Sequence, residues 1–154
     1  MAEKTGFAHR VRVRREALGM TQRDLEAATG VRQSLISAIE SGRRAATPAT
    51  KEALERALDV RPSDLVRSRR SEMLQVMAAS GVSNPRLFGS LARGQDTRAS
   101  DVDLLLTFPD GADIADILHL EEQLAALLTV PVDVVGDLGD GAVLNRARAE
   151  AVPL

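Results

Sequence analysis

The sequence predicts an α+β protein in which a helical N-terminal domain is followed by a small α/β domain. Up to residue 66, apolar residues recur at helical spacing between capping and glycine signals. From residue 85 onward, short apolar runs typical of strands alternate with helical segments. Residues 1–70 contain 15 Lys or Arg against 9 Asp or Glu, whereas residues 71–154 contain 5 against 13. Balances of +6 and −8 indicate two domains with different partners. We expect domains at 1–66 and 85–154, with a hinge and a first helix of the second domain at 67–84.

Composition limits the class of protein. The chain has 154 residues, of which 44% are hydrophobic, and this is enough for one ordinary domain or two small ones. No stretch approaches the ~20 apolar residues of a membrane helix, and the polar start lacks a signal-peptide core. Cysteine is absent, which excludes disulfides and thiolate metal sites. A cytoplasmic protein that does not enter membranes is therefore expected.

The first three predicted helices form a compact pattern. Residues 7–18 give a first helix with Val11 and Leu18 on its inner face. Thr21 caps a helix over 22–28 that ends at Gly30. A further helix over 33–41 follows at once, with Ile36 and Ile39 pointing inward and Gly42 after it. Two helices joined by a tight glycine turn are typical of DNA-binding proteins.

Two more helices complete the predicted first domain. Thr47-Pro48 combines an N-cap with proline at the first helical position, which predicts a helix to Leu58. Residues 61–65 begin a last short turn that ends near Val66. The polar run at 67–70 is interpreted as the hinge, with a helix continuing into 71–79 as the alternative.

Residues 19–44 resemble the Xre/Cro type of helix-turn-helix over their whole length. The matching framework consists of Thr21-Gln22, Leu25, Ala28, Gly30-Val31, Gln33-Ser34, Ile36-Ser37, Ile39-Glu40 and Gly42. The resemblance implies that Gln22 contacts a phosphate, that Gln33, Ser34 and Ser37 face base edges, and that Arg43 and Arg44 meet the DNA backbone. Arg32 replaces a small capping residue and is counted with this DNA-binding set. Ala38 also departs from the usual pattern, so operator preference does not transfer. The alternative is an Xre-like protein-interaction module, and the basic balance favours DNA.

The second domain is predicted from three strands and two helices. The strands cover 86–88, 102–108 and 132–135. An amphipathic helix packs on the sheet through apolar residues at spacings of three, four and seven, namely Ile114, Ile117, Leu118, Leu124, Leu127 and Leu128. His119 within it has no neighbouring ligand pattern and is interpreted as a surface residue. A glycine-rich loop and a helix over 143–150 close the domain.

Polar residues gather where two of these strands meet a loop. Gly89-Ser90 is followed after ten residues by Asp101-x-Asp103. On a strand, Asp101 and Asp103 point the same way, roughly 6 to 7 Å apart at the backbone. Such a carboxylate pair suits Mg²⁺, and a glycine lets a polyphosphate approach the backbone closely. The alternative is a solvated strand edge and a simple turn. Asp133 on the third strand adds a carboxylate and favours a nucleotide-and-metal site.

Residues 85–154 resemble the minimal nucleotidyltransferase (MNT) family, which has the polymerase-beta type of α/β fold. The matching positions are Phe88-Gly89-Ser90, Ala92-Arg93-Gly94, Ser100–Leu105 and Val132-Asp133-Val134. The resemblance implies catalytic, Mg²⁺-binding Asp101, Asp103 and Asp133, with Gly89, Ser90 and Arg93 at the nucleotide. It also implies ATP as donor and adenylylation of a protein hydroxyl. Asp133 would complete one of two Mg²⁺ sites and take the acceptor proton.

The two resemblances together predict a DNA-binding antitoxin that represses its own operon. MNT proteins of this kind modify and neutralise a HEPN-type ribonuclease toxin. One alternative is a transcriptional regulator whose nucleotidyltransferase domain only binds nucleotide or a partner. Another is a small-molecule nucleotidyltransferase. A homodimer on duplex operator DNA is expected from the symmetry of helix-turn-helix proteins.

Overall fold

The structure is a computed structural model that describes residues 2–154, with side chains described from Gly6 onward. The chain divides into two compact units between Val60 and Arg61. Over the described residues, no helix combines the length and the apolar character needed to cross a membrane.

The first unit contains helices α1 (Ala2–Ala17), α2 (Gln22–Thr29), α3 (Gln33–Glu40) and α4 (Pro48–Ala57). Local signals set their ends as predicted. Thr21 forms a capping box with Asp24 at the start of α2, and Gly30 ends α2 at a φ of 74°. The Thr47 side chain caps α4, whose first residue is Pro48. The helical prediction for residues 22–58 is therefore confirmed.

One core unites these four helices. Its buried side chains are Phe7, Val11, Leu25, Ile36, Ile39, Leu54 and Leu58. Leu18 does not belong to it, contrary to expectation, because α1 ends at Ala17 and Leu18 is 41% exposed in the following turn. Val13 of α1 is also fully buried. The unit thus has a core of its own.

The boundary between the units differs from the expected position. Residues 67–70 do not form a hinge, because α5 (Pro62–Ser68) and α6 (Arg70–Ala79) follow each other across Arg69. Leu65 and Val66 of α5 are buried, and α5 packs on α6 and on α8 (Ile114–Leu128) in the second unit. The basic residues 1–70 therefore include four arginines that belong to the second unit, namely Arg61, Arg67, Arg69 and Arg70. Residues 1–60 carry 11 Lys or Arg against 8 Asp or Glu, a balance of only +3.

The second unit is built on a four-stranded sheet of order β3-β2-β1-β4. Its strands are β1 (Ser83–Phe88), β2 (Val102–Thr107), β3 (Val132–Gly136) and β4 (Val152–Pro153). β2 runs antiparallel to β1 and parallel to β3, while β4 is antiparallel to β1. β4 was not predicted, since two residues that include a proline give no periodic signal.

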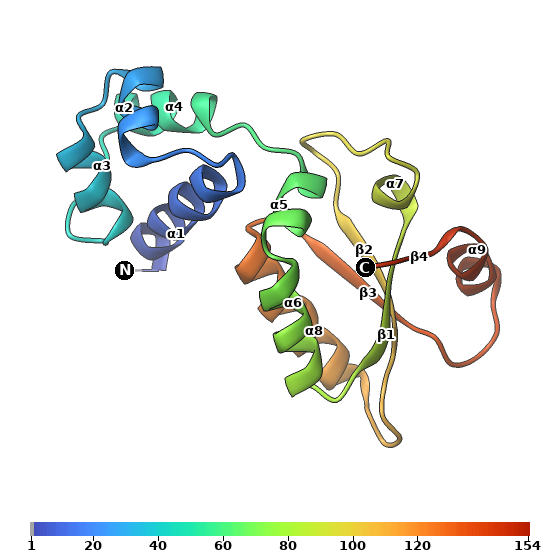
Figure 1. Ribbon diagram of the computed structural model, residues 1–154. Helices are drawn as coiled ribbons and strands as arrows, with labels where there is room; N and C mark the ends of the chain where they lie inside the picture. The colour runs from blue at the N-terminus through green and yellow to red at the C-terminus, as the bar shows by residue number, and fades with distance from the viewer. Residues whose placement is uncertain (1) are drawn as a thin grey trace. The chain divides into compact units, whose positions relative to one another are not determined.

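Helices cover both faces of this sheet. α6 and α8 pack against each other (Figure 1), and α8 contacts β3. On the other face, α9 (Ala142–Glu150) packs Leu144 and Ala147 onto Leu105 of β2. α7 (Gly89–Ala92) is a single turn directly after β1. Asp103 and Leu105 lie on the same side of β2, so the predicted site residues face the α9 side.

The buried face of α8 differs in part from the prediction. Leu120, Leu124 and Leu128 are fully buried, but Ile114 is 69% and Leu118 55% exposed. Glu121 of α8 also contacts the sheet, since its Oε1 accepts a hydrogen bond of 2.8 Å from the Val134 backbone N–H on the edge strand β3. That bond satisfies a donor that would otherwise be unpaired at the sheet edge.

A charged cluster fastens α9 and the preceding loop to the sheet. The Asp137 carboxylate accepts a hydrogen bond of 2.8 Å from Nε of Arg148 on α9 and another from Arg86 on β1. Arg148 also donates to the backbone oxygens of Asp137 and Gly139. The bonds from Arg148 and Arg86 lower the pKa of Asp137. Asp137 therefore links three elements of the second unit.

This cluster predicts a pH-dependent effect of Asp137→Asn. A carboxyl with a lowered native pKa stabilises the fold above its unfolded pKa of about 3.9, and this contribution is lost as pH falls through the native pKa. At pH 7 we expect the free energy of unfolding to fall by about 1 kcal/mol. Urea unfolding of both proteins from pH 7 to pH 3 measures this. The difference should shrink below about pH 4, and a constant difference would contradict the assignment.

Candidate functional site

The strand register brings the predicted carboxylates together. Asp103 on β2 is the direct neighbour of Asp133 on the parallel strand β3. Adjacent strands lie about 4.8 Å apart. Asp101 precedes β2 and follows the same alternation as Asp103. On the other side of β2, Asp103 faces Phe88, the residue before Gly89. The end of β1 and the starts of β2 and β3 therefore form one rim.

The electrostatics of Asp103 show that this rim is short of positive charge. Burial raises the pKa of Asp103, and the charges of Asp133 and then Asp101 raise that pKa further. Arg93 lowers the pKa of Asp103, and Glu150 raises it. A carboxylate that is partly desolvated and repelled by two others is stabilised by a bound cation.

Gly89 lies directly against Asp103. Its φ is +69°, and a Cβ at this position would stand 2.3 Å from Oδ2 of Asp103. Both the backbone conformation and the contact require glycine. The following Ser90 is half-buried in α7, and its carbonyl accepts a hydrogen bond of 2.9 Å from the Gln95 N–H. The Gly-Ser motif and the Asp-x-Asp motif are thus parts of one site.

Arg93 is held at this site by a partner that sequence reasoning missed. Its guanidinium forms an ion pair with Glu150 on α9 and donates to Gln95 at 3.2 Å. Arg93 and Glu150 are 57 residues apart. No local spacing indicates such a pair. Glu150 therefore joins the site as a further carboxylate.

The donor groups fit a divalent cation, although the fit is incomplete. Over the described residues, no group of three His, Cys, Asp or Glu side chains is arranged to hold a metal ion. Mg²⁺ typically takes only one or two protein carboxylates and completes its shell with water and phosphate oxygens. The mutual repulsion of Asp101, Asp103 and Asp133 favours such an ion. Carboxylates from this rim would hold it together with a substrate.

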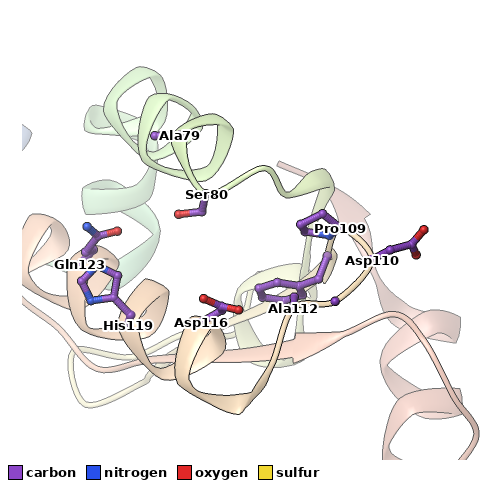
Figure 2. Close-up of a pocket in the computed structure, with 10 residues that line it drawn as sticks. Ala79, Ser80, Pro109, Asp110, Ala112, Asp116, His119 and Gln123 are labelled. Carbon is purple, nitrogen blue, oxygen red and sulfur yellow. The ribbon is translucent and has the colours of Figure 1, made fainter.

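A further hollow lies elsewhere in the second unit. It has a volume of about 520 Å³ and is bounded by the end of α6, the loop after β2 and the first half of α8. Figure 2 shows Ser80, Asp116, His119 and Gln123 around it. None of the three site carboxylates lines this hollow. His119, interpreted as a surface residue, is exposed at its wall.

In the first unit, two of the predicted DNA-binding side chains, Gln22 and Gln33, share one hydrogen-bond network. Gln33 donates to Gln22 at 2.7 Å, and Gln22 donates to Glu40 at 2.9 Å. Glu40 in turn accepts two bonds from Arg15, of 2.6 and 3.1 Å. The side chains of Arg15 and Glu40 are 12% and 6% exposed. Arg15 and Glu40 are 25 residues apart, so no local spacing indicated that this pair supports the predicted DNA-binding residues.

The remaining predicted DNA contacts lie at the ends of α3 or on its surface. Arg32, Ser34, Arg43 and Arg44 are exposed, and Ser37 is half-buried. Nε of Arg43 donates to the Ser41 hydroxyl at 2.8 Å. Their exposure leaves the long arginine side chains accessible to phosphate.

Comparison with protein families finds one family in each part of the chain. The helix-turn-helix family matches residues 11–65, and the nucleotidyltransferase domain family matches residues 70–151. The chain belongs to the nucleotidyltransferase family. Its N-terminal part is an Xre-type helix-turn-helix domain, whose family match extends into α5. Both resemblances inferred from the sequence motifs and the predicted α+β fold class are confirmed.

Relatives of this nucleotidyltransferase match its second unit. A protein assigned as a protein adenylyltransferase in Methanocaldococcus jannaschii is 31% identical over 42% of this chain and 69% of its own length. The protein adenylyltransferase MntA of Thermococcus cleftensis is 42% identical over 36% of this chain and 56% of its own. A solved structure of a protein assigned as a minimal nucleotidyltransferase has 36% identity and a TM-score of 0.53, covering 60% of this chain and 95% of that one.

Proposed function

We propose that this nucleotidyltransferase is a DNA-binding antitoxin and autoregulator that adenylylates a HEPN-type toxin with ATP in the presence of Mg²⁺. The observation that carries the proposal is the convergence of Asp101, Asp103 and Asp133 at a rim where Gly89 touches Asp103. Relatives that match this unit are named protein adenylyltransferases. Family membership and geometry therefore support the same chemistry.

The proposed reaction assigns a task to each site residue. The acceptor hydroxyl oxygen bonds to the α-phosphorus of ATP, the bond from that phosphorus to the β-phosphate oxygen breaks, and pyrophosphate leaves. Asp133 takes the acceptor proton. Carboxylates among Asp101, Asp103 and Asp133 would hold Mg²⁺ together with substrate oxygens, and the ion would activate the hydroxyl and neutralise the leaving group. Gly89 admits the phosphates to the backbone, while Ser90 and Arg93 donate to their oxygens.

The composition favours an acceptor on another protein. The chain contains no tyrosine, so any tyrosine adenylylation must occur on a partner. The second unit spans only residues 61–154, and a partner protein would complete the acceptor side of its site. Co-expression with the product of the adjacent gene tests this. The partner should gain the mass of an adenylyl group, and an unmodified partner that is still neutralised would contradict it.

A second function is favoured by one observation. Glu150 occupies the guanidinium of Arg93, the group proposed to meet the phosphates. A regulator that only binds nucleotide, or only binds its partner, is consistent with this contact. In that case the toxin would be neutralised without transfer. The co-expression experiment separates these two functions.

The proposed DNA binding predicts a steep dependence on salt. Binding to operator DNA should weaken as salt rises, because phosphate contacts release counterions. Arg43→Ala and Arg44→Ala should each reduce the slope of log affinity against log salt by about 1. Arg56→Ala is the control, because this exposed arginine of α4 pairs with Glu52 and lies outside the predicted contact set. Salt titrations of a DNA shift measure the slopes, and equal slopes for all variants would contradict the assigned face.

A further inference from the structure

Asp96 is an unusual residue in the loop that joins the two halves of the candidate site. Among residues 6–154, whose burial is described, it is the only buried polar or charged residue, with 6% of its surface exposed. Burying a carboxylate is costly unless hydrogen bonds compensate it. The residue therefore requires an explanation beyond a solvated loop.

The partner of Asp96 is the start of α5. Its Oδ2 accepts a hydrogen bond of 2.9 Å from the Ser63 backbone N–H, 33 residues earlier in the chain. α5 has no side-chain cap of its own, since Arg61 at its N-cap makes no such bond. Asp96 thus satisfies one of the donors that a helix leaves free in its first turn.

Several other bonds of this loop are local. The Gln95 N–H donates to the Ser90 carbonyl at 2.9 Å. The Thr97 N–H donates to the Ser100 hydroxyl at 2.8 Å, and the Ser100 N–H donates to the Thr97 carbonyl at 3.0 Å. These bonds shape the loop itself. The bond from Asp96 ties the middle of the loop to α5, and the ion pair of Arg93 with Glu150 ties its start to α9.

We propose that Asp96 is a positioning residue that places Asp101 against Asp103 and Asp133 by anchoring the loop to α5. Asp101 comes directly after the Thr97–Ser100 turn and is itself exposed, so its place depends on the loop before it. The inference rests on the proposed function, because it assigns Asp101 to the binding of Mg²⁺ and ATP. When the loop leaves its anchored position, the site is incomplete. The apparent affinity for Mg²⁺–ATP is then the intrinsic affinity multiplied by the fraction of molecules whose site is complete.

If Asp96 acts by positioning the loop, its loss should weaken the binding of Mg²⁺–ATP but leave the rate of the chemical step unchanged. Asp96→Leu removes the acceptor and keeps an apolar side chain of similar size in the buried position. Asp96→Asn keeps an oxygen that can accept from Ser63 but removes the charge. Asp140→Leu in the exposed loop before α9 is the control for loss of an acidic residue from this unit.

The test measures Mg²⁺–ATP binding by calorimetry on the full chain, together with the KM and kcat of transfer. We expect Asp96→Leu to weaken binding and raise the KM about tenfold, with kcat at saturating Mg²⁺–ATP within about twofold of wild type. Asp96→Asn and Asp140→Leu should stay within about twofold of wild type in both quantities. Amide hydrogen exchange at residues 97–101 should be faster in Asp96→Leu alone.

Several outcomes would overturn the inference. A lower melting temperature for Asp96→Leu with unchanged Mg²⁺–ATP affinity would make Asp96 a cap of α5 only. If Asp96→Asn weakened Mg²⁺–ATP binding as much as Asp96→Leu does, the charge of Asp96 and not its hydrogen bond to Ser63 would be responsible. If Asp96→Leu does not fold, Asp96→Ala takes its place in the same comparison. A wild type that binds no Mg²⁺–ATP would instead overturn the proposed function, and the exchange at 97–101 would still show whether Asp96 anchors the loop.

Discussion

Replacing Asp101 and Asp103 by Asn is expected to reduce nucleotidyl transfer by several orders of magnitude while leaving the fold intact. Metal stabilisation supplies several kcal/mol of barrier reduction, and each ~1.4 kcal/mol corresponds to a tenfold change in rate. Asparagine keeps the size of each side chain. Burial and the charges of Asp133 and Asp101 already raise the pKa of Asp103, so removing charge relieves repulsion. Stability should therefore be unchanged or slightly higher.

The double variant is measured by initial rates of transfer and by thermal unfolding. Asp110→Asn is the matched control, because this exposed residue lies in the loop after β2, away from the rim. DNA binding should survive in both proteins, since residues 2–60 have their own core. Transfer that persists in the double variant would remove Asp101 and Asp103 from the proposed chemistry.

Gly89→Ala is expected to lower transfer by at least about a hundredfold and the free energy of unfolding by about 1 to 2 kcal/mol. A Cβ at Gly89 would stand 2.3 Å from Oδ2 of Asp103, so Asp103 or the α7 turn must move. A displacement of about 1 Å at a reacting centre can cost a hundredfold in rate. The φ of +69° adds the cost of placing a side chain in the left-handed region.

Gly94→Ala separates these two contributions. Gly94 has a φ of +66°, but a Cβ there would meet no atom within 4 Å. Gly94→Ala should lose only the stability that the left-handed backbone costs, Gly89→Ala should lose at least as much, and only Gly89→Ala should lose most of its activity. Initial rates at equal folded fractions, with unfolding in urea, make the comparison. An equal loss of activity in both would show that backbone strain, and not the contact with Asp103, is what matters.

Local motifs made most of the candidate site predictable. Gly89, Asp101 and Asp103 lie within one short stretch, and strand alternation fixes the common face of the two aspartates. Asp133 required one further assumption, that its strand neighbours β2, and the parallel register confirms it. The caps at Thr21 and Thr47 were equally readable, because capping depends on adjacent residues.

Long-range contacts set what could not be predicted. Apolar spacing predicts that α8 has an apolar face, but it does not say which apolar residues turn toward the sheet. Ile114 and Leu118 are exposed, whereas Leu120, Leu124 and Leu128 are buried. The observed rotation also places Glu121 at the edge strand, a contact 13 residues away in sequence that apolar spacing does not indicate. Glu150 and Asp96 take their roles from partners 57 and 33 residues away. The compact units divide after Val60, whereas the helix-turn-helix family match runs to residue 65 in α5, so the expected domain boundary at residue 66 stays a prediction.

The most direct measurement uses ATP with a radioactive α-phosphate. This ATP is incubated with Mg²⁺, this protein and the purified product of the adjacent gene, and the protein that carries the label is identified. The account predicts that the label appears on the partner protein, that pyrophosphate is released in equal amount, and that both depend on Asp101 and Asp103. Label found only on this chain, at serine or threonine, would contradict a trans-acting adenylyltransferase. A partner that is neutralised without any label would leave a protein that binds nucleotide or partner and transfers nothing.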